Sequence, residues 1–399
     1  MIKKLLLFMA AVMAAGMVSA QDVVIKRDTV RDTIVVREVV REYILTSDTA
    51  KIAQIQKNGV TESKKKKQPI KIHFDFRGDW HSTFDDRPAS ERELDGADAY
   101  KSAFEGKYLQ FYLDGNITDG LSYHYRQRLN RLNGIDNLFK SIDKAYMQYD
   151  FKSGWNVAAG KFPMAIGGWE YDAAPIDVFF ATEFWNQVYC FQLGIRGGYK
   201  FADGRNSLVA EIANSPFNPV EKGMANNMYA YSLLWYGDYN VFQSSYSVNV
   251  MEIKDGTYIG QVVLGNRFLA GPMTIELDWT QRFHEKNNLM GDFSGVLNVK
   301  GNIHDWVNIF GKVDYDQNRT NIFYGVSKDE PYWINYNDQI LTYGVGVEVF
   351  PIKKQKFFRL HTYWYQTLNL GKDYWKDYDL KRHHLSIGLT VDFTAFERK

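Results

Sequence analysis

Basic side chains recur at alternate positions in several segments of this chain, as at Arg126 and Arg128. Successive side chains of a β-strand point to opposite faces, so this spacing places both guanidinium groups on one face. Basic groups on the wall of a wet channel attract anions and repel cations. The side chains predicted to form such a basic path are Arg126, Arg128, Arg196, Lys200, Lys300 and Lys312.

Acidic side chains fall on the same polar face, which leaves two interpretations of the channel open. One is the salt-bridged, mixed-charge wall of a general pore. The other is an anion-preferring path along the arginines and Lys200. The acidic positions that weigh against strong anion preference are Asp75, Asp79, Asp114, Glu276, Asp278 and Glu348.

Segments of alternating polarity must position these groups, and residues 385–393 show the pattern most clearly. Every second residue there is apolar and the others are small or polar. A membrane-spanning β-strand needs this alternation over ~9–11 residues, with lipid on one face and water on the other. Sixteen such segments are predicted, at 71–84, 107–118, 121–131, 141–151, 155–162, 188–201, 207–214, 229–237, 241–251, 257–269, 273–284, 293–304, 307–316, 339–350, 357–366 and 383–393.

The connections between these segments alternate between short and long, apart from the one near Gly256. Short ones carry turn residues, such as Asp119 and Gly120. Short periplasmic turns and longer external loops are typical of outer-membrane barrels. We therefore predict an all-β fold, a transmembrane antiparallel β-barrel of about sixteen strands that occupies residues 70–399.

Composition agrees with a barrel. Aromatic residues make up 16% of the chain, as the girdles at the two membrane interfaces require. The net charge of +1 argues against nucleic acid as a partner, because such proteins carry a basic surplus. Cys190 is the single cysteine, so an internal disulfide and a cysteine-based metal site are both excluded.

The N-terminus reads as a secretory signal. Lys3 and Lys4 precede an apolar run, and small residues end it near Ala20, which predicts a cleaved signal peptide over residues 1–20. Residues 21–69 carry charged repeats and a basic run, and are predicted to form a periplasmic leader that is flexible, partly helical or oligomerising. The predicted location is the outer membrane of a Gram-negative bacterium.

The connection at 163–187 is the longest between wall strands and is rich in aromatic residues. Such a loop should pack against something, and the barrel interior is available. It is predicted to fold inward and constrict the channel, although an external lid or a subunit contact is the alternative. The residues predicted to line the constriction are Trp169, Glu170, Tyr171, Asp172, Phe184 and Trp185.

Three short motifs around this loop resemble the phosphate-selective porin O and P family. They are 160–162, Gly-Lys-Phe; 167–172, Gly-Gly-Trp-Glu-Tyr-Asp; and 184–187, Phe-Trp-Asn-Gln. The resemblance extends over roughly residues 70–393 and implies a sixteen-stranded trimeric porin with its third external loop folded inside. It also implies a path of arginines and lysines for anions. The loop carries no Lys or Arg between Phe162 and Gln187, which departs from what a tight phosphate site would offer.

The predicted function is passive diffusion of small hydrophilic solutes, with anions or phosphate preferred if the basic path operates. A non-conducting barrel that acts as a scaffold or binding partner is the main alternative, and a barrel enzyme is the weaker one. No catalytic residues and no cofactor are predicted, and no metal site either, because adjacent His383 and His384 point to opposite faces of a strand. The predicted partners are small hydrophilic or anionic solutes, outer-membrane lipids and two further copies of the chain.

Overall fold

A computed structural model describes residues 70–96, 98–131, 141–217, 228–254, 256–283, 289–318, 339–352, 355–371 and 381–398. The predicted signal peptide and periplasmic leader lie outside these residues. No helix in the described ranges is long and apolar enough to cross a membrane, a finding that does not bear on strands.

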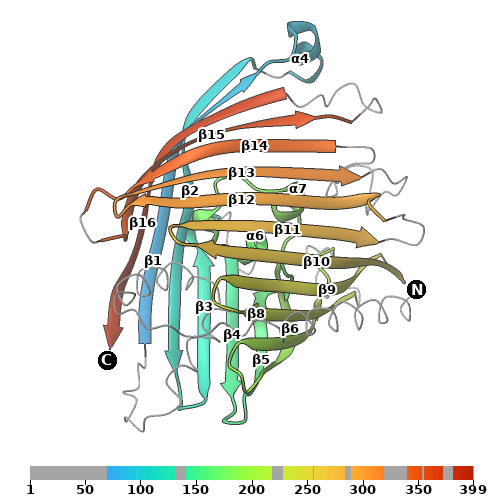
Figure 1. Ribbon diagram of the computed structural model, residues 1–399, viewed down its shortest axis with the longest axis vertical. Coiled ribbons are helices and arrows are strands. Elements are labelled where there is room, and N and C mark those ends of the chain that lie inside the picture. The colour runs from blue at the N-terminus through green and yellow to red at the C-terminus, as the bar shows by residue number, and fades with distance from the viewer. Residues whose placement is uncertain are drawn as a thin grey trace, which may run out of the picture. The chain divides into compact units, whose positions relative to one another are not determined.

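Sixteen antiparallel strands form a closed barrel in which each pairs with its neighbours in sequence, and β1 pairs with β16 (Figure 1). This confirms the predicted fold class. The strands are β1 Ile70–Asp85, β2 Tyr100–Asn116, β3 Leu121–Arg128, β4 Ile142–Asp150, β5 Trp155–Pro163, β6 Phe191–Lys200, β7 Asn206–Asn214, β8 Tyr229–Asp238, β9 Phe242–Lys254, β10 Thr257–Ala270, β11 Met273–Phe283, β12 Asp292–His304, β13 Val307–Asn318, β14 Gln339–Val349, β15 Phe358–Asn369 and β16 Lys381–Arg398.

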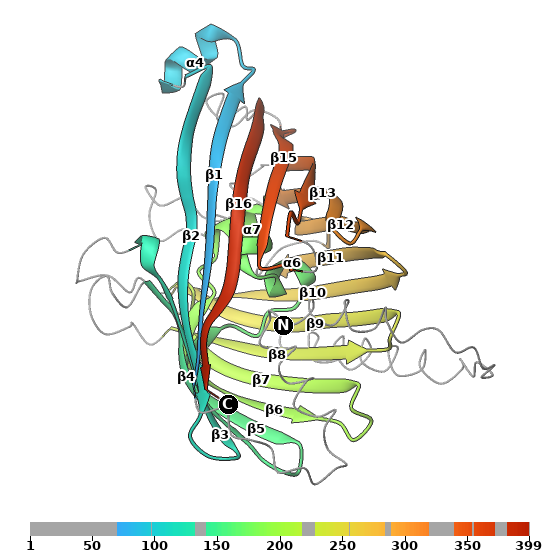
Figure 2. The ribbon, with the colours of Figure 1, turned by 90° about the vertical axis from the view of Figure 1, so that its left-hand side faces the viewer.

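Within the described ranges, the helical elements all lie in connections between strands. A short helix, α4 (Ala89–Asp95), lies between β1 and β2, and the turn η1 (Leu129–Arg131) follows β3. The third long connection holds α6 (Trp169–Asp172), η3 (Pro175–Asp177) and α7 (Glu183–Gln187). Figures 1 and 2 show α6 and α7 inside the ring of strands, so the long third loop folds inward as predicted.

Several predicted strand boundaries were wrong, and three of these differences have a clear structural reason. β2 begins at Tyr100 rather than 107, because the bulge opposite Arg77 and Gly78 lets the strand continue with its faces exchanged. β6 begins at Phe191 rather than 188, since the preceding residues belong to the inward loop. β16 continues past Phe393 to Arg398 and pairs with the first residues of β1 (Figure 2).

The outward face of the barrel carries apolar and aromatic side chains, as contact with lipid requires. Near the short turns that follow β4 and β6, exposed and half-buried aromatic rings lie in contact. Tyr149 and Phe151 meet with ring centroids 4.7 Å apart, and Trp155 meets Tyr199 at 4.8 Å. Rings with an apolar body and a polar edge favour the membrane interface, so these residues form part of an aromatic girdle.

Gly160 of β5 provides a test of how tightly the wall strands approach. Its φ is +133°, and a Cβ there would lie 2.3 Å from the carbonyl oxygen of Ala145 and 2.6 Å from the Cα of Tyr146. Gly160→Ala should lower the free energy of unfolding by roughly 1–3 kcal/mol, because backbone must move to admit the methyl group. Urea titration of the folded barrel measures this loss. Gly197→Ala is the control, because its Cβ would meet only an oxygen at 3.9 Å; equal losses in both variants would refute the steric explanation.

Candidate functional site

The inward loop is held by an ion-paired hub on β13. Lys312 Nζ contacts the carboxylate of Glu170 on α6 and lies 3.2 Å from Asp314 Oδ1. It also donates a hydrogen bond of 2.7 Å to the carbonyl oxygen of Phe180. Glu170 in turn accepts from the backbone N–H and hydroxyl of Thr182, at 3.0 and 2.6 Å. One ammonium group therefore ties two parts of the loop to the wall.

Carboxylates of the wall bind backbone N–H groups of the loop at three further places. Asp278 Oδ2 accepts from the N–H groups of Trp169 and Glu170, at 2.7 and 2.8 Å. Glu211 accepts from Ala165 at 3.2 Å, and Asp316 accepts from Glu183 at 2.8 Å. Buried backbone N–H groups need such partners, so these acidic residues serve as anchors for the backbone of the loop.

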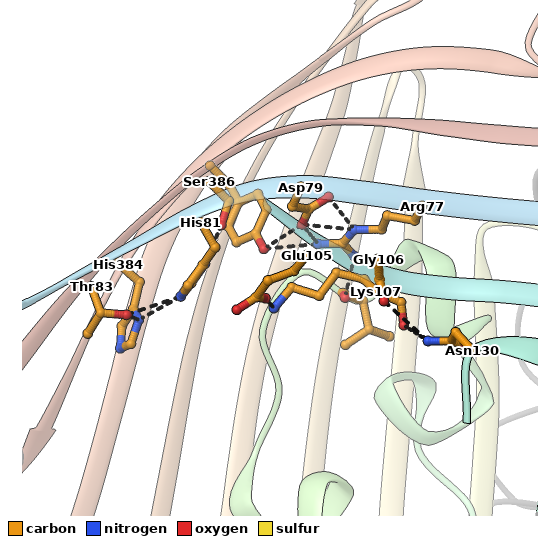
Figure 3. Close-up of polar contacts among 12 residues, drawn as sticks. Arg77, Asp79, His81, Thr83, Glu105, Gly106, Lys107, Asn130, His384 and Ser386 are labelled. Atoms are coloured by element: carbon orange, nitrogen blue, oxygen red, sulfur yellow. Dashed lines mark hydrogen bonds and ion pairs between the residues drawn. The ribbon is translucent and has the colours of Figure 1, made fainter. Parts of the chain in front are cut away.

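On the opposite side of the loop, two arginines hold η3 and the residue after it. Arg77 Nη1 on β1 donates to the carbonyl oxygen of Val178 at 2.8 Å, and Arg359 Nη2 on β15 donates to that of Ile176 at 3.0 Å. Arg359 also ion-pairs with Asp177. Arg77 is fixed by Asp79 at 2.8 Å, as the close-up in Figure 3 shows. The loop thus supplies acids and carbonyl oxygens, and the wall supplies the cations.

Apolar and aromatic contacts also hold the loop against the barrel wall. Met164, Ile166, Phe184 and Val188 pack in one buried cluster with side chains of β8–β10, and each fully buried apolar side chain contributes about 1.5–3 kcal/mol. The guanidinium carbon of Arg267 lies 3.6 Å from the ring centroid of Trp169, a cation–π contact. The loop is therefore packed into the lumen rather than suspended across it.

The residues predicted to line the constriction divide into packed and partly exposed groups. Trp169 and Phe184 are buried at 1% and 4% exposure, so they seat the loop rather than face an open passage. Tyr171 packs against the same cluster as Phe184. Asp172 and Trp185 are partly exposed. Burial raises the pKa of the Cys190 thiol, at the end of this loop, to about 11, so the thiol is protonated at neutral pH and unreactive.

The six predicted basic residues all lie on the lumen side of their strands. Residues that are paired across neighbouring strands point to the same face, and the pairing can be followed around the barrel. The structure brings two of them together. Arg126 and Arg128 share Asp143 at 3.1 and 2.7 Å, and both lie against the ring of Phe191. They are 5% and 8% exposed, so they would act on a solute through their field more than through contact.

The other four lie apart from this pair, and of these four only Lys300 and Lys312 are neighbours, on the paired strands β12 and β13. Arg196 stacks on Phe162 at 3.8 Å and donates to the carbonyl oxygen of Pro163 at 3.1 Å, where the loop begins. Lys200 is the last residue of β6, at the end with short turns. Lys300 pairs with Glu348 at 2.8 Å, and Lys312 is the hub described above. These positions do not form one continuous row.

Charge is unevenly distributed around the described strands. β3–β6 carry six Lys or Arg residues against two Asp residues, whereas β11–β13 carry three Lys or Arg against five Asp or Glu. The strand order places these two groups about half the ring apart. The wall therefore has a basic side and an acidic side.

Sequence reasoning missed two contacts between paired strands, one across a bulge and one across the closure of the barrel. Asp143 lies at a bulge of β4, where the pairing shifts, so alternation alone does not assign its face. His81 and His384 meet across β1 and β16, 303 positions apart (Figure 3). The described residues hold no group of three His, Cys, Asp or Glu side chains arranged to bind a metal ion.

Comparison with known proteins agrees with this architecture. The family model for phosphate-selective porin O and P matches residues 75–263, which run from β1 into β10. No curated protein matches the chain significantly. Among solved structures, the chain resembles an anion-selective porin from Comamonas acidovorans (TM-score 0.56, 11% identity, 82% of this chain and all of that chain covered). It also resembles the outer-membrane channel DcaP of Acinetobacter baumannii (0.55, 13%, 81% and 97%) and OmpT of Vibrio cholerae (0.51, 9%, 81% and 97%).

The likeness to these solved structures shows the fold, and the family model matches a little under half of the chain. The model covers the strands that build the basic side of the wall and the whole inward loop. The closed barrel of sixteen strands continues the same architecture to the C-terminal strand. The chain therefore resembles the phosphate-selective porin O and P family over residues 75–263 and has the fold of outer-membrane porins, which locates it in the outer membrane of a Gram-negative bacterium.

Proposed function

We propose that this porin lets small hydrophilic solutes diffuse passively and that its β3–β6 side favours anions. The observation that carries the proposal is the basic surplus on β3–β6 across the ring from the acidic surplus on β11–β13. Charged groups on the wall of a pore select by sign. An anion would therefore pass along the basic side, near Arg126, Arg128 and Arg196.

A dedicated phosphate site has weaker support than a general anion preference. The loop offers no Lys or Arg between Phe162 and Gln187, and its acids Glu170 and Asp177 are bound by cations of the wall. Most lumen cations described above also have an acidic partner. We therefore propose a modest anion preference, and treat competition by phosphate as a separate measurement.

Reversal potentials of single channels under a salt gradient test the anion preference. Arg126, Arg128 and Asp143 together carry a net charge of +1. The double variant Arg126→Gln/Arg128→Gln gives this cluster a net charge of −1, and the triple variant, which adds Asp143→Asn, gives it a net charge of 0. Anion preference should thus fall in the order wild type, triple variant, double variant. The triple variant is the matched control, because it removes the same guanidinium groups without leaving an uncompensated acid.

Three outcomes would change the proposal. Equal reversal potentials in all three proteins would remove this cluster from the pathway and leave a general porin. If adding phosphate reduces the current, a phosphate site within the channel would be favoured. An absence of conductance steps from a folded wild-type barrel would favour the scaffold function over the channel.

We also propose that the protein assembles as a trimer and that residues 21–69 form a periplasmic leader. The support for assembly is at the level of the fold, since the similar OmpT of Vibrio cholerae is described in a trimer form. Native mass spectrometry of the protein with and without residues 21–69 tests both statements. A trimer that persists without the leader supports them. If the protein without the leader is only monomeric, the leader is required for assembly.

A further inference from the structure

Two histidines and a threonine form a compact triangle of donor atoms on the inner face of β1 and β16. His81 Nε2 lies 3.3 Å from His384 Nδ1, and Thr83 Oγ1 lies 3.2 Å from each of these nitrogens. Figure 3 shows the three side chains converging from the two strands. All three are partly exposed, so a small solute in the lumen has access to them.

The three distances between these donor atoms match the spacing of ligand atoms around a small metal ion. Zinc–nitrogen bonds of about 2.0–2.1 Å in tetrahedral geometry separate neighbouring ligand atoms by about 3.3 Å. Without a metal, one proton must lie between the two imidazole nitrogens, because two bare lone pairs at this distance repel. A divalent ion that binds both nitrogens would displace that proton.

The surroundings fix the rings in the orientation that binding requires. His81 Nδ1 lies 2.6 Å from the hydroxyl of the fully buried Ser386, which leaves Nε2 turned toward the triangle. The ring of His384 stacks on Tyr365 at 4.3 Å with the planes 8° apart. A ligating histidine is usually oriented through its other nitrogen, as His81 is by Ser386, and such partners raise metal affinity.

The nearby charges permit a cation to enter. Lys107 acts electrostatically on both histidines, Arg77 acts on His81, and Arg382 acts on His384. Lys107 ion-pairs with Glu105, Arg77 with Asp79 at 2.8 Å, and Arg382 lies 3.5 Å from Asp85. Each of these positive charges therefore has an acid beside it, which reduces the repulsion that an entering cation would meet.

We propose that His81, His384 and Thr83 form a binding site for a borderline divalent transition-metal ion on the lumen wall. Two imidazoles favour Zn²⁺, Ni²⁺ or Cu²⁺ over Mg²⁺ or Ca²⁺, which prefer oxygen ligands. The hydroxyl of Thr83 supplies the third corner and water fills the remaining positions. The site lies toward the α4 end of β1, beyond the Arg77 contacts to the loop.

Isothermal titration of the full-length, tag-free protein with Ni²⁺ tests the site. His81→Asn and His384→Asn should each weaken binding at least about 10-fold, and Thr83→Val should weaken it less. His304→Asn is the control, because His304 is an exposed histidine next to the turn between β12 and β13. Unchanged affinity in the His81 and His384 variants, or an equal loss in the His304 variant, would overturn the proposal.

A second measurement on the unaltered protein covers the case in which a variant fails to fold. Diethyl pyrocarbonate modifies accessible histidines, and mass spectrometry locates the modified residues. Bound Zn²⁺ should protect His81 and His384 while His304 stays reactive. Equal reactivity of His81 and His384 with and without Zn²⁺ would show that the triangle does not bind the metal.

Discussion

Lys312→Met is expected to release the inward loop, which should give larger and noisier single-channel currents and a less stable barrel. The substitution keeps the length of the side chain but leaves Glu170 and Asp314 without their shared cation. Lys312 is 9% exposed and Asp314 1%. Removing one partner of a buried ion pair costs about 3–5 kcal/mol, because the remaining charge is left uncompensated.

Conductance recordings and urea titration measure the two effects of Lys312→Met separately. Adding Glu170→Gln should recover part of the stability while the current stays large, since the carbonyl of Phe180 still lacks its donor. Lys300→Met is the matched control, because Lys300 pairs with the wall residue Glu348. If Lys312→Met left the current level and noise unchanged, the hub would have no part in holding the loop.

The architecture was predictable from sequence because lipid and water impose a period of two on every strand. The short turns were predictable from their turn residues, and the loop at 163–187 from its length and aromatic content. Both lie at the predicted positions between strands. Strand ends were less predictable. A bulge such as that opposite Arg77 exchanges the faces of the remaining residues, and alternation read from one strand cannot locate it.

For the charged residues of the lumen, the sequence predicts the face of the strand but not the ion-pair partner. Alternation predicts that Lys312 faces inward, yet its partner Glu170 is 142 positions away on a loop. Arg126 and Arg128 depend on Asp143, whose face is set by a bulge. The same limit hid His81 and His384, because the closure of β1 on β16 unites the two ends of the barrel. Single-strand patterns carry no information about such pairs.

Arg77→Met is expected to destabilise the barrel by about 3–5 kcal/mol, since it removes the cation from a fully enclosed acidic group. Arg77 is 1% exposed and Asp79 2%. Asp79 also accepts from the hydroxyl of Tyr363 at 3.1 Å and lies 2.9 Å from His361 Nε2. These neutral partners satisfy its oxygens but do not replace the charge. Urea titration of the folded barrel gives the loss.

The loop contact of Arg77 can be separated from its ion pair by a second substitution. Arg77→Met/Asp79→Asn removes both charges, so most of the stability should return, while the hydrogen bond to the carbonyl of Val178 remains lost. Arg359 holds the adjacent Ile176, so adding Arg359→Met should enlarge the current more than the two arginine changes do separately, because neighbouring contacts couple. Strictly additive currents would mean that β1 and β15 hold the loop independently. An Arg77→Met barrel as stable as the wild type would mean that Asp79 is already neutralised by a shared proton with His361.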